Sequence, residues 1–283
     1  MRKNILIPTD FSKNAFNAIT YAFELFKEKE CNFHIFHSYF LPRSAKGNLL
    51  FPEPEPHEYD EAAKASGLSM LRLKDRVNQL PANSNHTIFF EDKYGTLIDL
   101  LNEKVTQDNI ALIIMGTRGV TNDVKIAYGR NAVNVMENVK GCPTLAVPAN
   151  FSYKKLNEIV FPTNFKSHFN ELEINTFTTL AAQDKAAIKI LHIGKEANLN
   201  SKQQENRKLL ESYFKDLHYS FHWVEKSSVK EAVLAFVDKE NSDLIAFVNR
   251  KHWFFGSVFS NPLVKSLGVH STVPVLALHD TRN

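Results

Sequence analysis

The chain has 283 residues, of which 43% are hydrophobic and 23% are charged, so it can bury the core of one or two globular domains. Lys and Arg number 34 against 31 Asp and Glu, and no segment gathers this small excess into a basic stripe, so neither nucleic acid nor a membrane surface is expected as a partner. The apolar run before Pro8 is too short for a signal peptide, no stretch could span a membrane, and Cys31 and Cys142 lack metal-site spacing. We expect a cytoplasmic protein with reduced cysteines.

Strands and helices are predicted to alternate through the first half of the chain. Lys3–Pro8 is a short apolar strand, and Ser12 is a suitable N-cap for the helix after it. Residues 40–56 form a predicted loop, whose role as a lid, an arm or plain surface is open. The further predicted strands and helices are residues 32–39, 58–80, 86–91, 96–106, 111–115, 132–139 and 144–147. This alternation predicts a doubly wound α/β domain with its ligand site at the carboxyl ends of the strands.

The pattern restarts near residue 154. Residues 3–17 are echoed by residues 157–171, with Pro8-Thr9 matched by Pro162-Thr163. Later segments echo the remaining strands in order, at residues 186–193, 220–225, 243–248 and 273–278. Such ordered similarity indicates two tandem copies. We predict domains at residues 1–150 and 151–283, each with a mainly parallel five-stranded sheet flanked by helices.

Three glycines mark the candidate ligand loop of the first copy. Gly116 ends a predicted strand, and Gly119 and Gly129 follow in the pattern Gly-x2-Gly-x9-Gly. Glycines at a strand-to-helix turn let the backbone approach a ligand, and the free N–H groups at the helix start favour a phosphate. Asp10 also follows a strand, so both signals lie at strand carboxyl ends. The alternatives are a plain tight loop for the glycines and a helix cap for Asp10.

The glycine spacing and Pro8-Thr9-Asp10 resemble the ATP-binding signature of the universal stress protein family, and the resemblance covers essentially the whole chain as a tandem member. It implies an adenine nucleotide alpha hydrolase-like fold and one site for ATP or a related adenine nucleotide. Asp10 would lie by the adenosine, Ser38 by the adenine and Met115 by the ribose. The implied binding residues are Pro8, Thr9, Asp10, Ser38, Met115, Gly116, Gly119, Gly129, Arg130 and Asn131.

Arg130 and Asn131 depart from the family pattern, which usually has Ser or Thr after the last glycine. A guanidinium needs more room than a hydroxyl. Arg130 therefore either adds a charged bidentate contact to a phosphate or fills the pocket and signals the loss of ATP binding. Whether Mg²⁺ accompanies the nucleotide is also open.

The second copy lacks the residues of this signature. Asn164 stands in place of Asp10, and Val248 in place of Gly116. A Gly256-Ser257 pair is out of register by about one helical turn. The sequence therefore predicts at most one nucleotide site, in the first copy.

No nucleophile–base set or carboxylate pair is indicated by spacing, so no catalytic residue is predicted and we expect slow ATP hydrolysis at most. His34 and His37 lie three residues apart on a strand and point to opposite faces, which argues against a shared metal. The resemblance implies a regulatory stress-response protein that binds an adenine nucleotide. The alternative is a nucleotide-free interaction scaffold of the same fold, with the Pro-Glu-Pro-Glu-Pro loop and Trp253-Phe254-Phe255 as contact points.

The closing strands carry a prediction about assembly. Relatives in the family dimerise through their last strands. By resemblance, Thr144–Val147 and residues 273–278 would pair within one chain as an intramolecular pseudo-dimer, which covers two open sheet edges. Whether two chains then form a homodimer is open.

Overall fold

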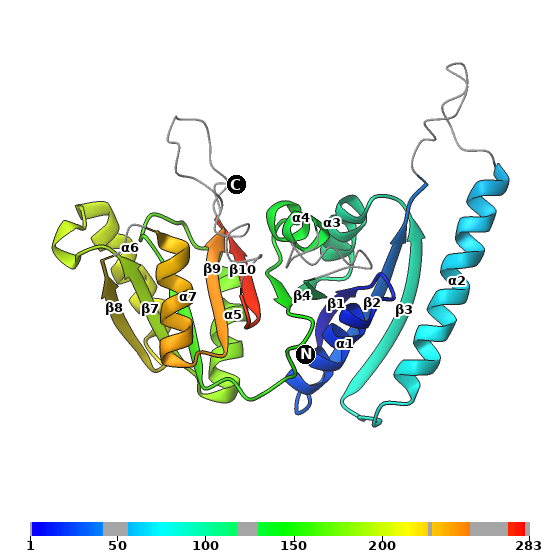
Figure 1. The fold of residues 1–283 in the computed structure, drawn as a ribbon, viewed down its shortest axis with the longest axis horizontal. Helices are drawn as coiled ribbons and strands as arrows, with labels where there is room; N and C mark the ends of the chain where they lie inside the picture. The colour runs from blue at the N-terminus through cyan, green and yellow to red at the C-terminus, as the bar shows by residue number, and fades with distance from the viewer. Residues whose placement is uncertain (1, 42–55, 118–129, 226–227, 250–270, 281–283) are drawn as a thin grey trace, which may run out of the picture.

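A computed structural model describes residues 2–41, 56–117, 130–225, 228–249 and 271–280, and shows a ten-stranded sheet between two layers of helices (Figure 1). The strands are β1 (Lys3–Pro8), β2 (Cys31–Tyr39), β3 (His86–Tyr94), β4 (Ile110–Gly116), β5 (Thr144–Val147), β6 (Glu158–Pro162), β7 (Ala187–Ile193), β8 (Tyr219–Val224), β9 (Leu244–Asn249) and β10 (Val275–His279). The helices are α1 (Lys13–Leu25), α2 (Pro56–Asn78), α3 (Leu97–Gln107), α4 (Arg130–Asn138), α5 (Glu171–Asp184), α6 (Ser201–Phe214) and α7 (Val229–Glu240), with a short 3-10 turn, η1 (Glu196–Asn198).

The strand order is β3-β2-β1-β4-β5-β10-β9-β6-β7-β8. Neighbouring strands pair in parallel within each half, which confirms the predicted doubly wound architecture in both copies. At the centre β5 and β10 pair antiparallel, with Ala146 opposite Val275 and Thr144 opposite Ala277, so the predicted pairing of the closing strands is confirmed. The two five-stranded sheets therefore form one continuous sheet. The predicted domain boundary at residues 150 and 151 falls between β5 and β6 and stays a prediction.

Alternate residues of each strand enter two separate hydrophobic cores, one on each face of the sheet. On β1, Ile5 belongs to one core and Leu6 to the other. The same alternation holds at the seam, where Leu145 and Leu276 lie in the first core and Ala146 and Ala277 in the second. Since strands of both copies contribute to each core, both cores run across the seam.

The predicted elements are present, with shifted ends. β3 runs to Tyr94 rather than to residue 91, because its pairing with β2 continues to Tyr39. The long helix α2 begins at Pro56, a residue suited to a first helical turn. Ser12 caps α1 as predicted, with its Oγ accepting from the N–H of Ala15 at 3.1 Å. Cys31 and Cys142 are free and buried, also as predicted.

Two carboxylates hold the segment that joins the copies. Asp184 accepts the N–H of Leu156 at 2.9 Å. Asp243 accepts the N–H of Asn157 at 2.7 Å, and Lys154 Nζ lies 2.7 Å from its other oxygen. The connection is therefore fixed to α5 and to the start of β9 rather than free.

We predict that Leu145→Ala lowers the free energy of unfolding by about 2–5 kcal/mol, because Leu145 is fully buried in a core that crosses the seam. Both tryptophans, Trp223 and Trp253, lie in the second copy. Tryptophan fluorescence and circular dichroism should therefore shift together in denaturant titrations. Leu172→Ala, at a side chain that is 75% exposed, is the control and should change stability by less than about 0.5 kcal/mol. If the fluorescence transition of Leu145→Ala stays at the denaturant concentration of the wild type, the two copies unfold independently and the prediction is wrong.

We also predict that Asp243 contributes stability that is lost in acid. Burial by itself raises the pKa of Asp243, but hydrogen bonds from Lys154 and from the N–H groups of Asn157 and Glu158 outweigh burial and hold that pKa below its usual value. Its contribution is therefore present at neutral pH and disappears as the pH falls through the lowered pKa. In pH-dependent thermal melts, Asp243→Asn should be less stable than the wild type at pH 7, and the difference should shrink below about pH 4. The exposed Asp216→Asn is the control and should track the wild type throughout; a difference at Asp243 that does not vary with pH would contradict the prediction.

Candidate functional site

The predicted site residues that the structure describes lie at the carboxyl ends of three strands and at the start of α4. Pro8 ends β1, Ser38 is next to last in β2, and Met115 and Gly116 end β4. β1 lies between β2 and β4, so these strand ends are neighbours at the point where the strand order reverses. The structure thus brings this part of the predicted site together.

The residues predicted to contact phosphates are described only in part. Arg130 and Asn131 are the first two residues of α4, and Asn131 is exposed. Gly119 and Gly129 lie outside the described residues, as do residues 42–55 of the predicted loop and the second-copy segment with Trp253-Phe254-Phe255 and Gly256-Ser257. The contacts predicted for these residues stay predictions.

A tight turn follows β1. The buried Thr9 donates its N–H to the carbonyl of Phe36 at 2.8 Å, and its Oγ1 accepts from the N–H of Phe11 at 3.1 Å. Asp10 Oδ1 accepts from the N–H of Ser12 at 3.1 Å, while Ser12 itself caps α1. Asp10 therefore fixes the turn ahead of the helix, and it is Ser12 rather than Asp10 that acts as the N-cap. Phe11 has a φ of 63°, in the left-handed region.

His37 holds this turn from β2. Its Nδ1 lies 2.7 Å from the carbonyl oxygen of Thr9, and its ring lies 4.4 Å from that of Phe11. A carbonyl only accepts, so Nδ1 of His37 carries a proton and donates it to Thr9. Sequence reasoning missed this role. The available signal was that His37 and His192 occupy equivalent positions in the repeat.

The second copy builds the same turn. Thr163 donates to the carbonyl of Leu191 at 2.9 Å, Asn164 Oδ1 accepts from an N–H two residues on at 3.0 Å, and His192 Nδ1 lies 2.9 Å from the carbonyl of Thr163. Phe165, with a φ of 56°, matches Phe11. An amide at the acid's position therefore supports the turn equally well. The charge of Asp10 is not needed for the local fold.

The two turns differ in what covers them. In the second copy Gln203 on α6 donates to the carbonyl of Asn164 at 2.8 Å, and Asn206 donates to the carbonyl of Phe165 at 2.8 Å. Both amides are buried. In the first copy, within the described part of the chain, the second carboxylate oxygen of Asp10 accepts no hydrogen bond. Among the described residues, the acid of the first turn therefore keeps one oxygen without a hydrogen-bond donor.

Gly116 is required by the packing of α1. A Cβ at this position would lie 2.9 Å from the side chain of Asn14 and 2.9 Å from its backbone oxygen. The close approach that excludes a side chain is therefore made by a helix of the protein itself. The predicted contact of Gly116 with a ribose stays a prediction.

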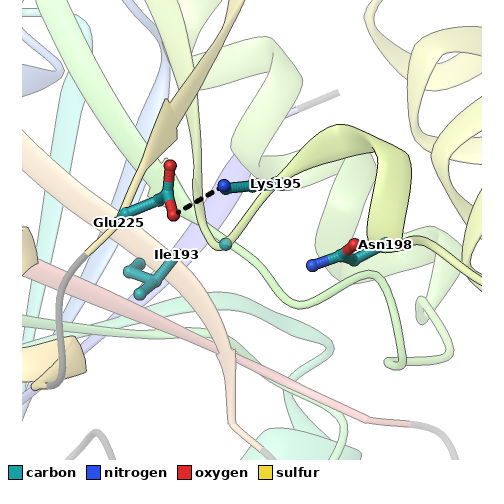
Figure 2. Close-up of a pocket in the computed structure, with 5 residues that line it drawn as sticks. Ile193, Lys195, Asn198 and Glu225 are labelled. Atoms are coloured by element: carbon teal, nitrogen blue, oxygen red, sulfur yellow. Dashed lines mark ion pairs between the residues drawn. The ribbon is translucent and has the colours of Figure 1, made fainter.

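A pocket of about 420 Å³ lies in the second copy, at the carboxyl ends of β7 and β8 (Figure 2). Its lining residues are Ile193, Gly194, Lys195, Asn198 and Glu225. Lys195 and Glu225 form an exposed ion pair of 3.3 Å at its edge. Because His192 is equivalent to His37, Ile193 is equivalent to Ser38. The carboxyl end of β7, the second strand of this copy, thus borders a pocket that is lined in part by polar side chains.

Two general features of the described residues complete the description of the site. They contain no group of three or more His, Cys, Asp or Glu side chains placed to hold a metal ion. None of the helices among them combines the length and the apolar character needed to cross a bilayer.

We predict that Gly116→Ala lowers the free energy of unfolding by about 1–3 kcal/mol, because the added methyl group forces α1 away from β4. Gly67→Ala is the matched control, since a Cβ there meets nothing within 4 Å in the middle of α2. That change should stabilise the protein by about 0.5–1 kcal/mol. Urea titrations measure both variants. Wild-type stability of Gly116→Ala would contradict the packing explanation.

Comparisons with known proteins agree with this fold. A universal stress protein from Archaeoglobus fulgidus DSM 4304 matches with a TM-score of 0.70 at 16% identity, over 98% of each chain. A putative universal stress protein from Pseudomonas aeruginosa UCBPP-PA14 matches with a TM-score of 0.60 at 11% identity, over 99% of this chain and 94% of that chain. A universal stress protein in complex with cAMP covers 52% of this chain and 98% of its own at 18% identity, with a TM-score of 0.37. No curated protein matches the chain.

At these identities the structural matches show a shared fold. The family model of the Universal stress protein family matches residues 1–148, which is more than half of the 283 residues. The chain therefore belongs to the Universal stress protein family.

Proposed function

We propose that the chain is a cytoplasmic, regulatory stress-response protein that binds ATP or a related adenine nucleotide in its first copy. The observation that carries the proposal is the state of Asp10. One oxygen of its carboxylate holds the turn, and the other accepts no hydrogen bond among the described residues. The second copy folds the same turn with Asn164, so the charge at Asp10 has no structural task there.

The strand ends around Asp10 suit a nucleoside. A carboxylate accepts from ribose hydroxyls or from an adenine N–H. Ser38 is next to last in the neighbouring strand β2, beyond the residues that pair with β1, and β4 ends on the other side of β1. This is the switch point at which sheets of this kind bind ligands.

The start of α4 suits the phosphates. The first N–H groups of a helix have no intrahelical acceptor, and the helix dipole favours negative charge there. Arg130 and Asn131 contribute two of these N–H groups. We propose that Arg130 adds its positive charge to a phosphate contact, with Gly119 and Gly129 leaving room for the phosphates.

The second copy is proposed to bind no nucleotide and to support the first. Its turn is covered by Gln203 and Asn206 from α6. The pairing of β5 with β10 supports the description of residues 1–150 and 151–283 as an intramolecular pseudo-dimer. We expect ATP to act as a bound effector that is hydrolysed slowly at most.

Calorimetric titration of the nucleotide-free protein with ATP, with and without Mg²⁺, tests the proposal. We predict one ATP per chain. Asp10→Asn should keep wild-type stability, because Asn supports the turn in the second copy, and should weaken binding by about tenfold or more, as expected for the loss of a hydrogen bond to a charged group. Asn164→Asp is the matched control and should leave affinity and stoichiometry unchanged.

Three outcomes would contradict the proposal. Unchanged affinity of Asp10→Asn would remove Asp10 from the site, and two ATP per chain would give the second copy a site of its own. Absence of binding at millimolar ATP would favour the nucleotide-free scaffold. In that case Arg130→Ser, which introduces a residue usual in the family, is the next test. If the Arg130 side chain blocks the pocket, this variant should regain ATP binding; if the chain has no nucleotide site, it should not.

A further inference from the structure

Two side chains of the second copy contact a carbonyl group at the end of helix α4, which belongs to the first copy. The last carbonyl groups of a helix have no partner within it. Lys140, whose N–H would bond the carbonyl of Met136 in a longer helix, donates instead to Asn102 Oδ1 at 3.0 Å. The carbonyl of Met136 accepts from Asn249 Nδ2 at 3.1 Å and from His279 Nε2 at 3.1 Å. Both donors come from the second copy, at the ends of β9 and β10.

The other side of the His279 ring faces a buried carboxylate. Nδ1 lies 3.2 Å from both oxygens of Glu173, and the backbone N–H of His279 donates to one of them at 2.7 Å. The exposed fraction is 1% for Glu173 and 8% for His279. A carbonyl oxygen and a carboxylate both accept. A ring that donates to both acceptors would carry two protons, as an imidazolium.

A positive charge on this ring would lie at the favourable end of α4, beside the carbonyl of Met136. A cation at a helix C-terminus interacts well with the helix dipole. The nine-residue helix is only about 13 Å long, and its inner side is anchored in the core by Ala132, Val135 and Met136. A short, anchored helix moves as one body. The contact that holds Met136 is therefore expected to influence the position of the helix start, at residues 130 and 131.

We propose that His279 is a positioning residue whose imidazolium, held by Glu173, caps α4 and places the start of that helix for the nucleotide phosphates. The expected effect of His279 on ATP affinity rests on the proposed function. The predictions about the charge of His279 and about amide exchange in α4 do not depend on it. The second copy is then a working part of the first copy's site rather than an inert repeat.

Other titratable groups surround the His279 ring. The titratable groups on the surrounding elements are Glu173 on α5, Glu137 on α4, Cys142 ahead of β5 and Asp280 beside His279. Burial, reinforced by the charge of Glu173, raises the pKa of Cys142, so that thiol stays neutral. The Asp280 carboxylate accepts the N–H of His168 at 3.2 Å.

The chain contains its own control for the charge state. His192 is also 8% exposed, but among the described residues its ring faces a single acceptor, the carbonyl of Thr163 at 2.9 Å. One acceptor requires only one proton. The contacts of His192 therefore need a proton on Nδ1 alone, whereas those of His279 need a proton on both ring nitrogens.

Nitrogen NMR of the imidazole rings in the ¹⁵N-labelled full chain, between about pH 5 and 8, separates the two states. His279, assigned with His279→Gln, should show two protonated nitrogens at neutral pH. Glu173→Gln should make that ring neutral at pH 7 and leave His192 unchanged. A neutral His279 ring in the wild type at pH 7 would overturn the proposal that an imidazolium caps α4.

Two measurements on His279→Gln test positioning. Amide hydrogen exchange in α4 should become faster than in the wild type, whereas exchange in α3 stays unchanged. ATP affinity should fall by about fivefold or more, the range usual for coupling between sites. Equal affinity in a wild type that binds ATP would overturn the positioning role. If the wild type binds no ATP, the proposed function fails. Unchanged amide exchange in α4 of His279→Gln would then also overturn the proposed capping of α4 by His279.

Discussion

The antiparallel pairing of β5 with β10 is the interaction on which the rest of the structure depends. It joins two five-stranded half-sheets and removes two edges that would otherwise present unpaired backbone groups. Leu145 and Leu276 then continue one hydrophobic core across the seam, and Ala146 and Ala277 continue the other. The same pairing brings β10 against α4, so that Met136 finds donors in the other copy. Without the seam, both cores and the end of α4 would face water.

The two copies keep the residues that build the fold and differ in those that suit a ligand. Both use a threonine and a histidine to hold the turn after the first strand, with matching distances. The acid of the first turn becomes an amide in the second, and α6 covers that second turn. The first turn thus carries an acid with one oxygen that accepts no hydrogen bond among the described residues, and the second carries an amide that α6 covers.

Much of the architecture could be predicted from the sequence because it follows from local pattern. Apolar runs indicated the strands, helical spacing indicated α1, and the echo of Pro8-Thr9 in Pro162-Thr163 revealed the repeat. The pairing of the closing strands was expected only from the family resemblance.

The finer features of the site could not be predicted, because each depends on residues far apart in the chain. The spacing of Gly116 suggested a ligand contact, whereas the fold shows that α1 passes so close that a Cβ atom there would lie 2.9 Å from Asn14. His37 gave no local sign that it would hold the carbonyl of Thr9. The contact of His279 with Glu173 spans 106 residues and leaves no spacing pattern. Such contacts follow from the topology, which sequence patterns describe only coarsely.

The central claim is that the first copy binds the nucleotide while the second supports it within one sheet. Photolabelling with an azido-adenine analogue of ATP, followed by peptide mapping, tests this claim most directly. The account predicts label that is displaced by ATP on peptides of residues 1–150, near the ends of β1 and β2. Displaceable label on peptides of residues 151–283, around the pocket at β7 and β8, would contradict it.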